Sequence, residues 1–237
     1  MLAGKKLFLL GLCITAAVAA TAPATAAAEE TPHFIKGGKE VTEELRVNGT
    51  ITSFFLRVPA LGYKFLCEGI DNKASIGAKW KSKLTIEFTK CTVYTVEGEE
   101  IPQCKVMEPV KIELLDQLIY KGGKKGEEIY DVFYGASSKK FTGLFSTIKF
   151  EGEDCAIAGT NAIKGSAVGL PTPKKPGEEA EVFKLKFMGE TALSGNYLNR
   201  ENETVEKAGE LKFGSSAASL EGEVKLELLG KEKFGGE

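Results

Sequence analysis

The side chains in this sequence that could perform chemistry are mostly carboxylates. They gather in two clusters, Glu97, Glu99 and Glu100, and Glu151, Glu153 and Asp154. Two carboxyl groups that face each other across a cleft are the machinery of glycoside hydrolysis. Both clusters adjoin glycines, however, which favours acids in solvent-exposed turns. The clusters therefore allow two interpretations. Either they form the active site of a hydrolase that uses acids alone, or they are solvent-exposed acids in turns.

Other catalytic patterns are weaker. Two serine–lysine pairs have the S-x-x-K spacing, Ser137 with Lys140 and Ser146 with Lys149. Enzymes of that type place the first motif at a helix start and carry S-D-N and K-T-G boxes, which this sequence lacks. The single histidine, His33, lies near the start of the expected mature chain, where termini are usually loose. We predict no catalytic residue among these, and no cofactor or metal site.

The cysteines predict covalent cross-links. Four of the five cysteines follow the N-terminal apolar segment: Cys67, Cys91, Cys104 and Cys155. An even number of cysteines in an exported chain indicates two disulfides. A zinc site would need short C-x-x-C pairs or several histidines, and the sequence has neither.

For the pairing we predict Cys91–Cys104 and Cys67–Cys155. The segment from Cys91 to Cys104 has the pattern of a hairpin that turns at Glu97-Gly98. A two-residue turn there puts Cys91 opposite Cys104, where Cα atoms lie about 4.5 Å apart and a disulfide can form. The second bridge then closes the longer loop, so Cys155→Ser is expected to destabilise more than Cys104→Ser.

The elements that must position these side chains are β-strands. Residues 84–89, 110–114, 183–187 and 224–228 alternate apolar and polar side chains. One buried and one wet face is the pattern of an antiparallel sheet, and we find no convincing helical spacing after the N-terminal segment. The predicted fold class is all-β: an antiparallel meander that forms a barrel or a sandwich, stapled by disulfides, with little or no helix.

Turn signals divide the chain further. Asn48-Gly49 predicts a two-residue hairpin. Its register places six apolar residues on one buried face: Val41, Leu45, Val47, Phe54, Leu56 and Val58. Gly37-Gly38, Gly122-Gly123 and Gly135 mark further turns. We predict one domain over residues 29–237, in which the proline-rich residues 171–180 are a long loop or, alternatively, a boundary.

The N-terminus predicts export. Within residues 1–28, a basic start with Lys5 and Lys6 is followed by an apolar run and then by small residues. This is the order of a secretory signal peptide, and the small residues predict cleavage after Ala26 or Ala28. The predicted location is therefore secreted, extracellular. Losing the two lysines takes the formal net charge from −2 to about −4, so nucleic acid is not an expected partner. No later stretch is apolar and long enough to cross a membrane as a helix.

A wider pattern covers most of residues 33–230. It consists of the Asn48-Gly49 hairpin, a strand that ends in Cys67, the run Phe88-Thr89-Lys90-Cys91, then Cys104, and Cys155 followed by Gly159 and Gly165. In this pattern the chain resembles a group of uncharacterised exported proteins of Gram-positive soil bacteria. The resemblance implies an exported four-cysteine all-β domain and brings no activity with it.

Three functions are compatible with these observations. The favoured one is a non-enzymatic extracellular binding or structural module, whose partner is a surface, a polymer or another protein. The first alternative is a β-barrel that carries a small apolar ligand, for which an apolar interior pocket would be the deciding observation. The second alternative is a carboxylate-based hydrolase, which needs two converging carboxyl groups, one with its pKa raised by burial.

Overall fold

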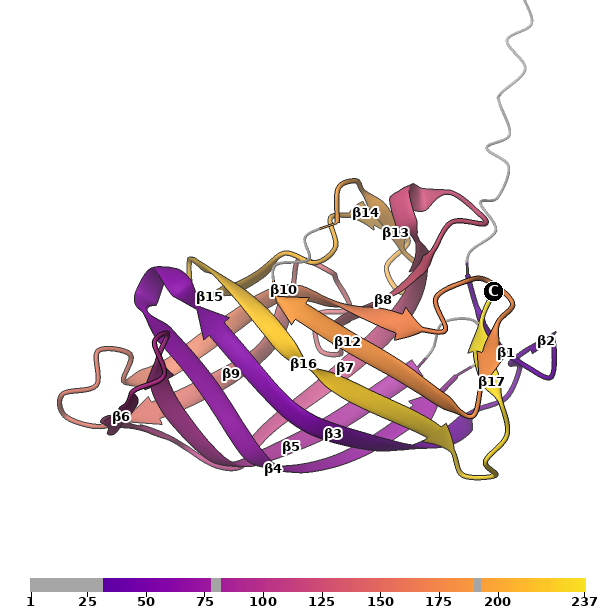
Figure 1. Ribbon diagram of the computed structural model, residues 1–237. Coiled ribbons are helices and arrows are strands. Elements are labelled where there is room, and N and C mark those ends of the chain that lie inside the picture. The colour runs from indigo at the N-terminus through magenta and orange to yellow at the C-terminus, as the bar shows by residue number, and fades with distance from the viewer. Residues whose placement is uncertain (1–31, 78–81, 190–192) are drawn as a thin grey trace, which may run out of the picture.

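The structure is a computed structural model that describes residues 32–77, 82–189 and 193–237. The predicted signal peptide and its cleavage sites, after Ala26 or Ala28, lie outside these residues. The described chain is mostly β-strand, and eight antiparallel strands close into a barrel, which confirms the predicted fold class (Figure 1). In the described ranges no helix has the length and apolar character needed to span a membrane.

The barrel strands are β3 (Leu45–Val58), β4 (Tyr63–Ile76), β5 (Ser82–Thr95), β7 (Val110–Tyr120), β8 (Ile129–Gly135), β10 (Gly159–Thr172), β12 (Val182–Gly189) and β16 (Ser216–Leu228). Three more strands complete its far end: β6 (Glu100–Val106), β9 (Leu144–Glu151) and β15 (Leu211–Phe213). Outside the barrel lie β1 (Phe34–Lys36), β2 (Lys39–Glu40), β11 (Glu179–Ala180), β13 (Tyr197–Asn199), β14 (Thr204–Glu206) and β17 (Phe234–Gly236). The 3-10 turns η1 (Pro59–Leu61) and η3 (Lys121–Gly123) connect strands.

The barrel is long because its longest strands run through two consecutive rings. The first ring follows the order β12-β16-β3-β4-β5-β7-β8-β10 and returns to β12. In the second ring β6, β9 and β15 take the places of β7, β8 and β12. On β5 the partner changes from β7, paired as far as Phe88, to β6, paired from Thr92. The strands β3, β4, β5, β10 and β16 therefore belong to both rings.

Apolar side chains point into the barrel with the predicted period of two. On β5, for example, Leu84, Ile86 and Phe88 are buried, whereas Lys83 and Glu87 are exposed. The runs at 110–114, 183–187 and 224–228 also alternate, with their apolar residues on the buried or half-buried side. Charged side chains accordingly cover much of the outer face, as expected for a sheet with one wet side.

The predicted hairpin at Asn48-Gly49 is wrong, because β3 passes straight through these residues. Gly49 is required there for another reason: the side chain of Asn72 occupies the space a Cβ would need, and its Nδ2 donates to Gly49 O at 2.9 Å. The six predicted apolar residues are nevertheless in or against the core. A bulge in β3 between Ile51 and Phe54 shifts the inward-facing side chains from odd-numbered to even-numbered residues. The predicted turn required the same shift, so the buried residues were predicted correctly despite the wrong hairpin.

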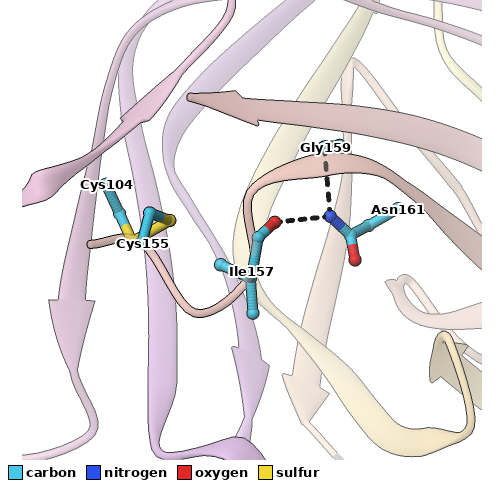
Figure 2. The surroundings of a disulfide bond; sticks show 5 residues. All are labelled: Cys104, Cys155, Ile157, Gly159 and Asn161. Atoms are coloured by element: carbon cyan, nitrogen blue, oxygen red, sulfur yellow. Dashed lines mark hydrogen bonds between the residues drawn. A yellow bond between two sulfur atoms is a disulfide. The ribbon is translucent and has the colours of Figure 1, made fainter. Parts of the chain in front are cut away.

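The predicted disulfide pairing is also wrong: the bridges are Cys67–Cys91 and Cys104–Cys155. The first joins directly paired residues of β4 and β5, whose Cα atoms lie 4.0 Å apart. The second joins β6 to the turn between β9 and β10 (Figure 2). Asn161 holds this turn, because its Nδ2 donates to Ile157 O at 2.8 Å.

The error lies in the register of the β5–β6 hairpin. The chain does turn near Glu97-Gly98, and Tyr94 pairs with Glu100. The next pair is Thr92 with Lys105, so β6 has residues 101–104 where β5 has Val93 alone. This bulge removes Cys104 from the position opposite Cys91. Because Cys104 and Cys155 share one bridge, the predicted difference between their serine variants has no basis.

A small sheet of β11, β17, β1 and β2 closes the end of the first ring. Phe34 on β1 stacks edge-on against Phe183, and Phe183 lies against Phe234 of β17, with ring centroids 6.2 Å and 5.3 Å apart. The expectation of a loose terminus at His33 is wrong, because its backbone N–H donates to Glu237 O at 2.7 Å and its carbonyl accepts from Glu237 N.

The proline-rich residues 171–180 connect β10 to β12 of the barrel, and their last two residues form β11 of the small sheet. Pro171 is itself part of β10 and pairs with Leu185 of β12. β12 also pairs along its whole length with β16, which in turn pairs with β3 near the start of the barrel. The strands before and after this connection thus build the same ring.

A second apolar layer covers the outside of β7 and β8, where the β13–β14 hairpin packs against them (Figure 1). As a result every residue of β7 from Leu114 to Tyr120 is buried. Gln117 fastens this layer: its Nε2 donates to Leu198 O at 2.9 Å, and its Oε1 accepts from Arg200 N at 3.1 Å.

Candidate functional site

The barrel encloses a cavity lined almost entirely by apolar side chains. The cavity volume is about 90 Å³. This is several times the ~10–15 Å³ that one water molecule needs, so the cavity has room for a small ligand. Seven phenylalanines line the cavity, and four of them lie in one row of neighbouring rings: Phe54, Phe88, Phe133 and Phe187. Neighbouring rings in this group lie 5.2–6.0 Å apart.

Small residues of β10 make room for the cavity. Ala167 lines it, and Gly169 faces the same way two residues further on. A Cβ on Gly169 would meet Leu185 Cδ2 at 3.3 Å and Phe133 Cε2 at 3.4 Å. The larger side chains of β8 and β12 therefore pack above the small residues of β10 inside the barrel.

Two aspartates interrupt the apolar wall. Asp116 of β7 and Asp131 of β8 both line the cavity, and they are only 6% and 1% exposed. In the register of β7 and β8, Asp131 pairs with Leu118. The two carboxyl groups are thus diagonal neighbours on the inner face, within reach of each other. On the other side of β7, Ser82 of β5 pairs directly with Asp116 and is equally buried.

Burial changes the acidity of both carboxyl groups. It raises the pKa of Asp116 to about 7, against smaller opposite effects of the nearby Ser82 and Asp131 side chains. Burial also raises the pKa of Asp131 well above its ordinary range, and the neighbouring Asp116 carboxyl raises it further. Near neutral pH the pair consequently holds at least one proton, like other close carboxyl pairs in apolar surroundings.

The polar atoms of this site are incompletely partnered. Within the described part of the chain, Ser82 Oγ and Asp131 Oδ1 are buried beside the Asp116 carboxyl and have no other hydrogen-bond partner. Among the described lining residues the one cation is Lys83, which is exposed on the outer side of β5. Buried polar atoms are normally hydrogen-bonded, and buried charges are normally paired. An apolar cavity with unpartnered oxygen atoms at one place is an arrangement that suits a ligand with a polar end.

The residues singled out in the sequence lie elsewhere. The acidic clusters Glu97, Glu99 and Glu100, and Glu151, Glu153 and Asp154, are exposed around the β5–β6 and β9–β10 turns. Ser137 and Lys140 are exposed in the turn after β8. Ser146 is buried and Lys149 exposed, on opposite faces of β9. Across the described residues, no three His, Cys, Asp or Glu side chains come together as a metal site would require.

Sequence reasoning missed Asp116 and Asp131, although a signal was present. Asp116 continues the alternation of Val110, Ile112 and Leu114 by one step, at a position where an apolar residue is expected. An acid in the inward phase of a strand must be buried, which marks it as unusual. Asp131 stands in the same way between Ile129 and Phe133.

Comparisons with protein families, with curated proteins and with solved structures find no match. The resemblance to exported proteins of Gram-positive soil bacteria stays a prediction.

Proposed function

We propose that this is a non-enzymatic exported binding protein that holds a small apolar molecule inside its barrel. The observation that carries the proposal is the apolar cavity within a closed antiparallel barrel. Closed barrels of this strand number have room in their interior for one small ligand. An interior pocket lined by apolar side chains is also what a β-barrel carrier of a small ligand requires.

Two features support an extracellular location. The signal peptide predicted at residues 1–28 would direct the chain out of the cell. The two disulfides agree with this, because such bridges persist mainly in oxidising compartments.

A carboxylate-based hydrolase is less well supported. Its two converging carboxyl groups would be Asp116 and Asp131, of which one has its pKa raised to about 7. Both side chains are more than nine-tenths buried and face the inside of the barrel, where a polymer cannot reach them. The two acidic clusters considered in the sequence are exposed around turns and do not line the cavity. A binding function accounts for the enclosed apolar wall, which hydrolysis of a polymer does not require.

Binding of naphthalene, followed by its fluorescence and by thermal unfolding, tests the proposal. Ala167→Leu puts a larger side chain into the cavity and should weaken binding by at least about tenfold, because the ligand loses its space. Ala217→Leu is the matched control, since Ala217 is exposed on β16. The proposal fails if the wild-type protein binds no naphthalene, or if folded Ala167→Leu protein binds it as well as Ala217→Leu protein does.

A further inference from the structure

The unpartnered polar atoms in the lumen call for hydrogen-bond donors. Apart from the Asp116 carboxyl beside them, Asp131 Oδ1 and Ser82 Oγ have no hydrogen-bond partner among the described residues. An ionised carboxyl oxygen can only accept, and a hydroxyl can both accept and donate. A primary ammonium offers three donors and no acceptor, so one such group can serve several acceptors at the same time.

The electrostatics of the cavity favour a cation over a neutral group. Ionising either Asp116 or Asp131 leaves a buried negative charge, and no described lining side chain supplies a positive charge inside the barrel. A buried charge is costly unless it is paired. An alcohol could donate to one oxygen but would leave the charge unbalanced. A ligand carboxylate would add a third acid to the two already present.

The aromatic wall beside the acids suits the same ligand. Phe133 is the cross-strand partner of Asp116 and lies two residues from Asp131 on the same inner face. Its ring is 5.4 Å from that of Phe187, which is 5.2 Å from that of Phe54. Aromatic faces attract ammonium groups, and they pack well against hydrocarbon.

We propose that the ligand is a small hydrophobic amine, which binds with its ammonium group at Asp116, Asp131 and Ser82 and its hydrocarbon body in the apolar cavity. This inference rests on the proposed function and specifies the class of ligand. The cavity volume of about 90 Å³ limits the body to one or two fused rings or a short branched chain. The amine enters as a cation and displaces a proton from the carboxyl pair.

Four ligands on one skeleton test this inference: 1-naphthylmethylamine, 1-naphthalenemethanol, 1-naphthoic acid and 1-methylnaphthalene. Isothermal titration calorimetry at pH 7.5 should find the amine bound at least about tenfold more tightly than the alcohol or the hydrocarbon, with the acid weakest. Repeating the amine titration in buffers of different ionisation enthalpy should show proton release. Amine affinity should rise from pH 5 to pH 8, since the carboxyl pair loses protons while the amine stays charged.

Variants locate the preference. Asp116→Asn/Asp131→Asn should abolish the advantage of the amine and keep the binding of 1-methylnaphthalene. Asp71→Asn, an exposed change on the outside of β4, should alter neither. If 1-methylnaphthalene fails to bind the wild-type protein, the proposed function itself is wrong. If 1-methylnaphthalene binds and the amine binds no more tightly, or without proton release, the function stands and this inference is overturned. The ligand series and the proton release need no variant, so the test holds even if the double variant does not fold.

Discussion

Replacing Asp116 by asparagine should change how the stability of this protein depends on pH. The ordinary pKa of the group is 3.8, and burial in the barrel raises it to about 7. The folded protein therefore holds this proton more tightly than the unfolded chain does. Stability from this source is complete below the unfolded pKa and declines as the pH rises from about 4 to about 7. At about 1.4 kcal/mol for each pKa unit, the decline amounts to about 4 kcal/mol.

Asparagine has nearly the same shape and no charge to bury, so the Asp116→Asn protein should escape this decline. Near pH 4.5 the free energies of unfolding of the two proteins should differ least among the three pH values, because most of the decline lies above this pH. At pH 8 the variant should be more stable, by up to about 4 kcal/mol. The raised pKa of Asp131 acts in the same direction, so the wild-type protein should lose more stability than Asp116 alone accounts for.

Urea unfolding followed by far-ultraviolet circular dichroism at pH 4.5, 6 and 8 measures the effect. Asp71→Asn makes the same chemical change on the exposed face of β4 and should follow the wild-type curve. Parallel pH curves for the wild-type and Asp116→Asn proteins would refute the reasoning, because they would mean that the Asp116 carboxyl does not ionise at higher pH in the fold than in the unfolded chain.

Three further outcomes are expected. Cys104→Ser and Cys155→Ser should each lower the unfolding free energy by a similar amount, about 4 kcal/mol for a loop of 51 residues, and a clear difference between them in denaturant titrations would contradict the shared bridge. Gln117→Leu should cost about 2–3 kcal/mol in the same measurement, because it removes the two hydrogen bonds from Gln117 to Leu198 O and Arg200 N and leaves these part-buried backbone groups unpaired. Mass spectrometry of the culture supernatant should find a chain that begins directly after Ala26 or Ala28; a chain that keeps residue 1 would exclude cleavage at either site.

The sequence predicts the strands of this protein better than their connections. Alternation of side chains identifies the inward residues because burial of one face is the same wherever a strand lies in the barrel. It does not reveal places where a strand changes phase. On β5 the inward set passes from Phe88 to Cys91 at Lys90, whose φ of 53° interrupts the extended backbone. A lysine at this conformation has no sequence signature, so the full length of β5 was not predictable.

The disulfides and the candidate site show a different limit. The register of the β5–β6 hairpin was predicted from its turn alone, but a bulge at residues 101–104 shifts it before β6 pairs with β9 at Lys105 and Val106. Asp116 and Asp131 could have been found by extending the alternation by one step. That they lie beside each other depends on the β7–β8 register, which the chain between them does not specify.

The pairing of β3 with β16 has a consequence for how the protein acquires a ligand. The pairing joins residues 45–58 to residues 216–228. The first ring therefore cannot close until this early segment has paired with a segment near the C-terminal end of the chain. Contacts between such distant segments form slowly, and the lumen does not exist before they form. If the chain crosses a membrane unfolded, it arrives empty. Under the proposed function, the ligand can therefore enter the barrel only after export and folding.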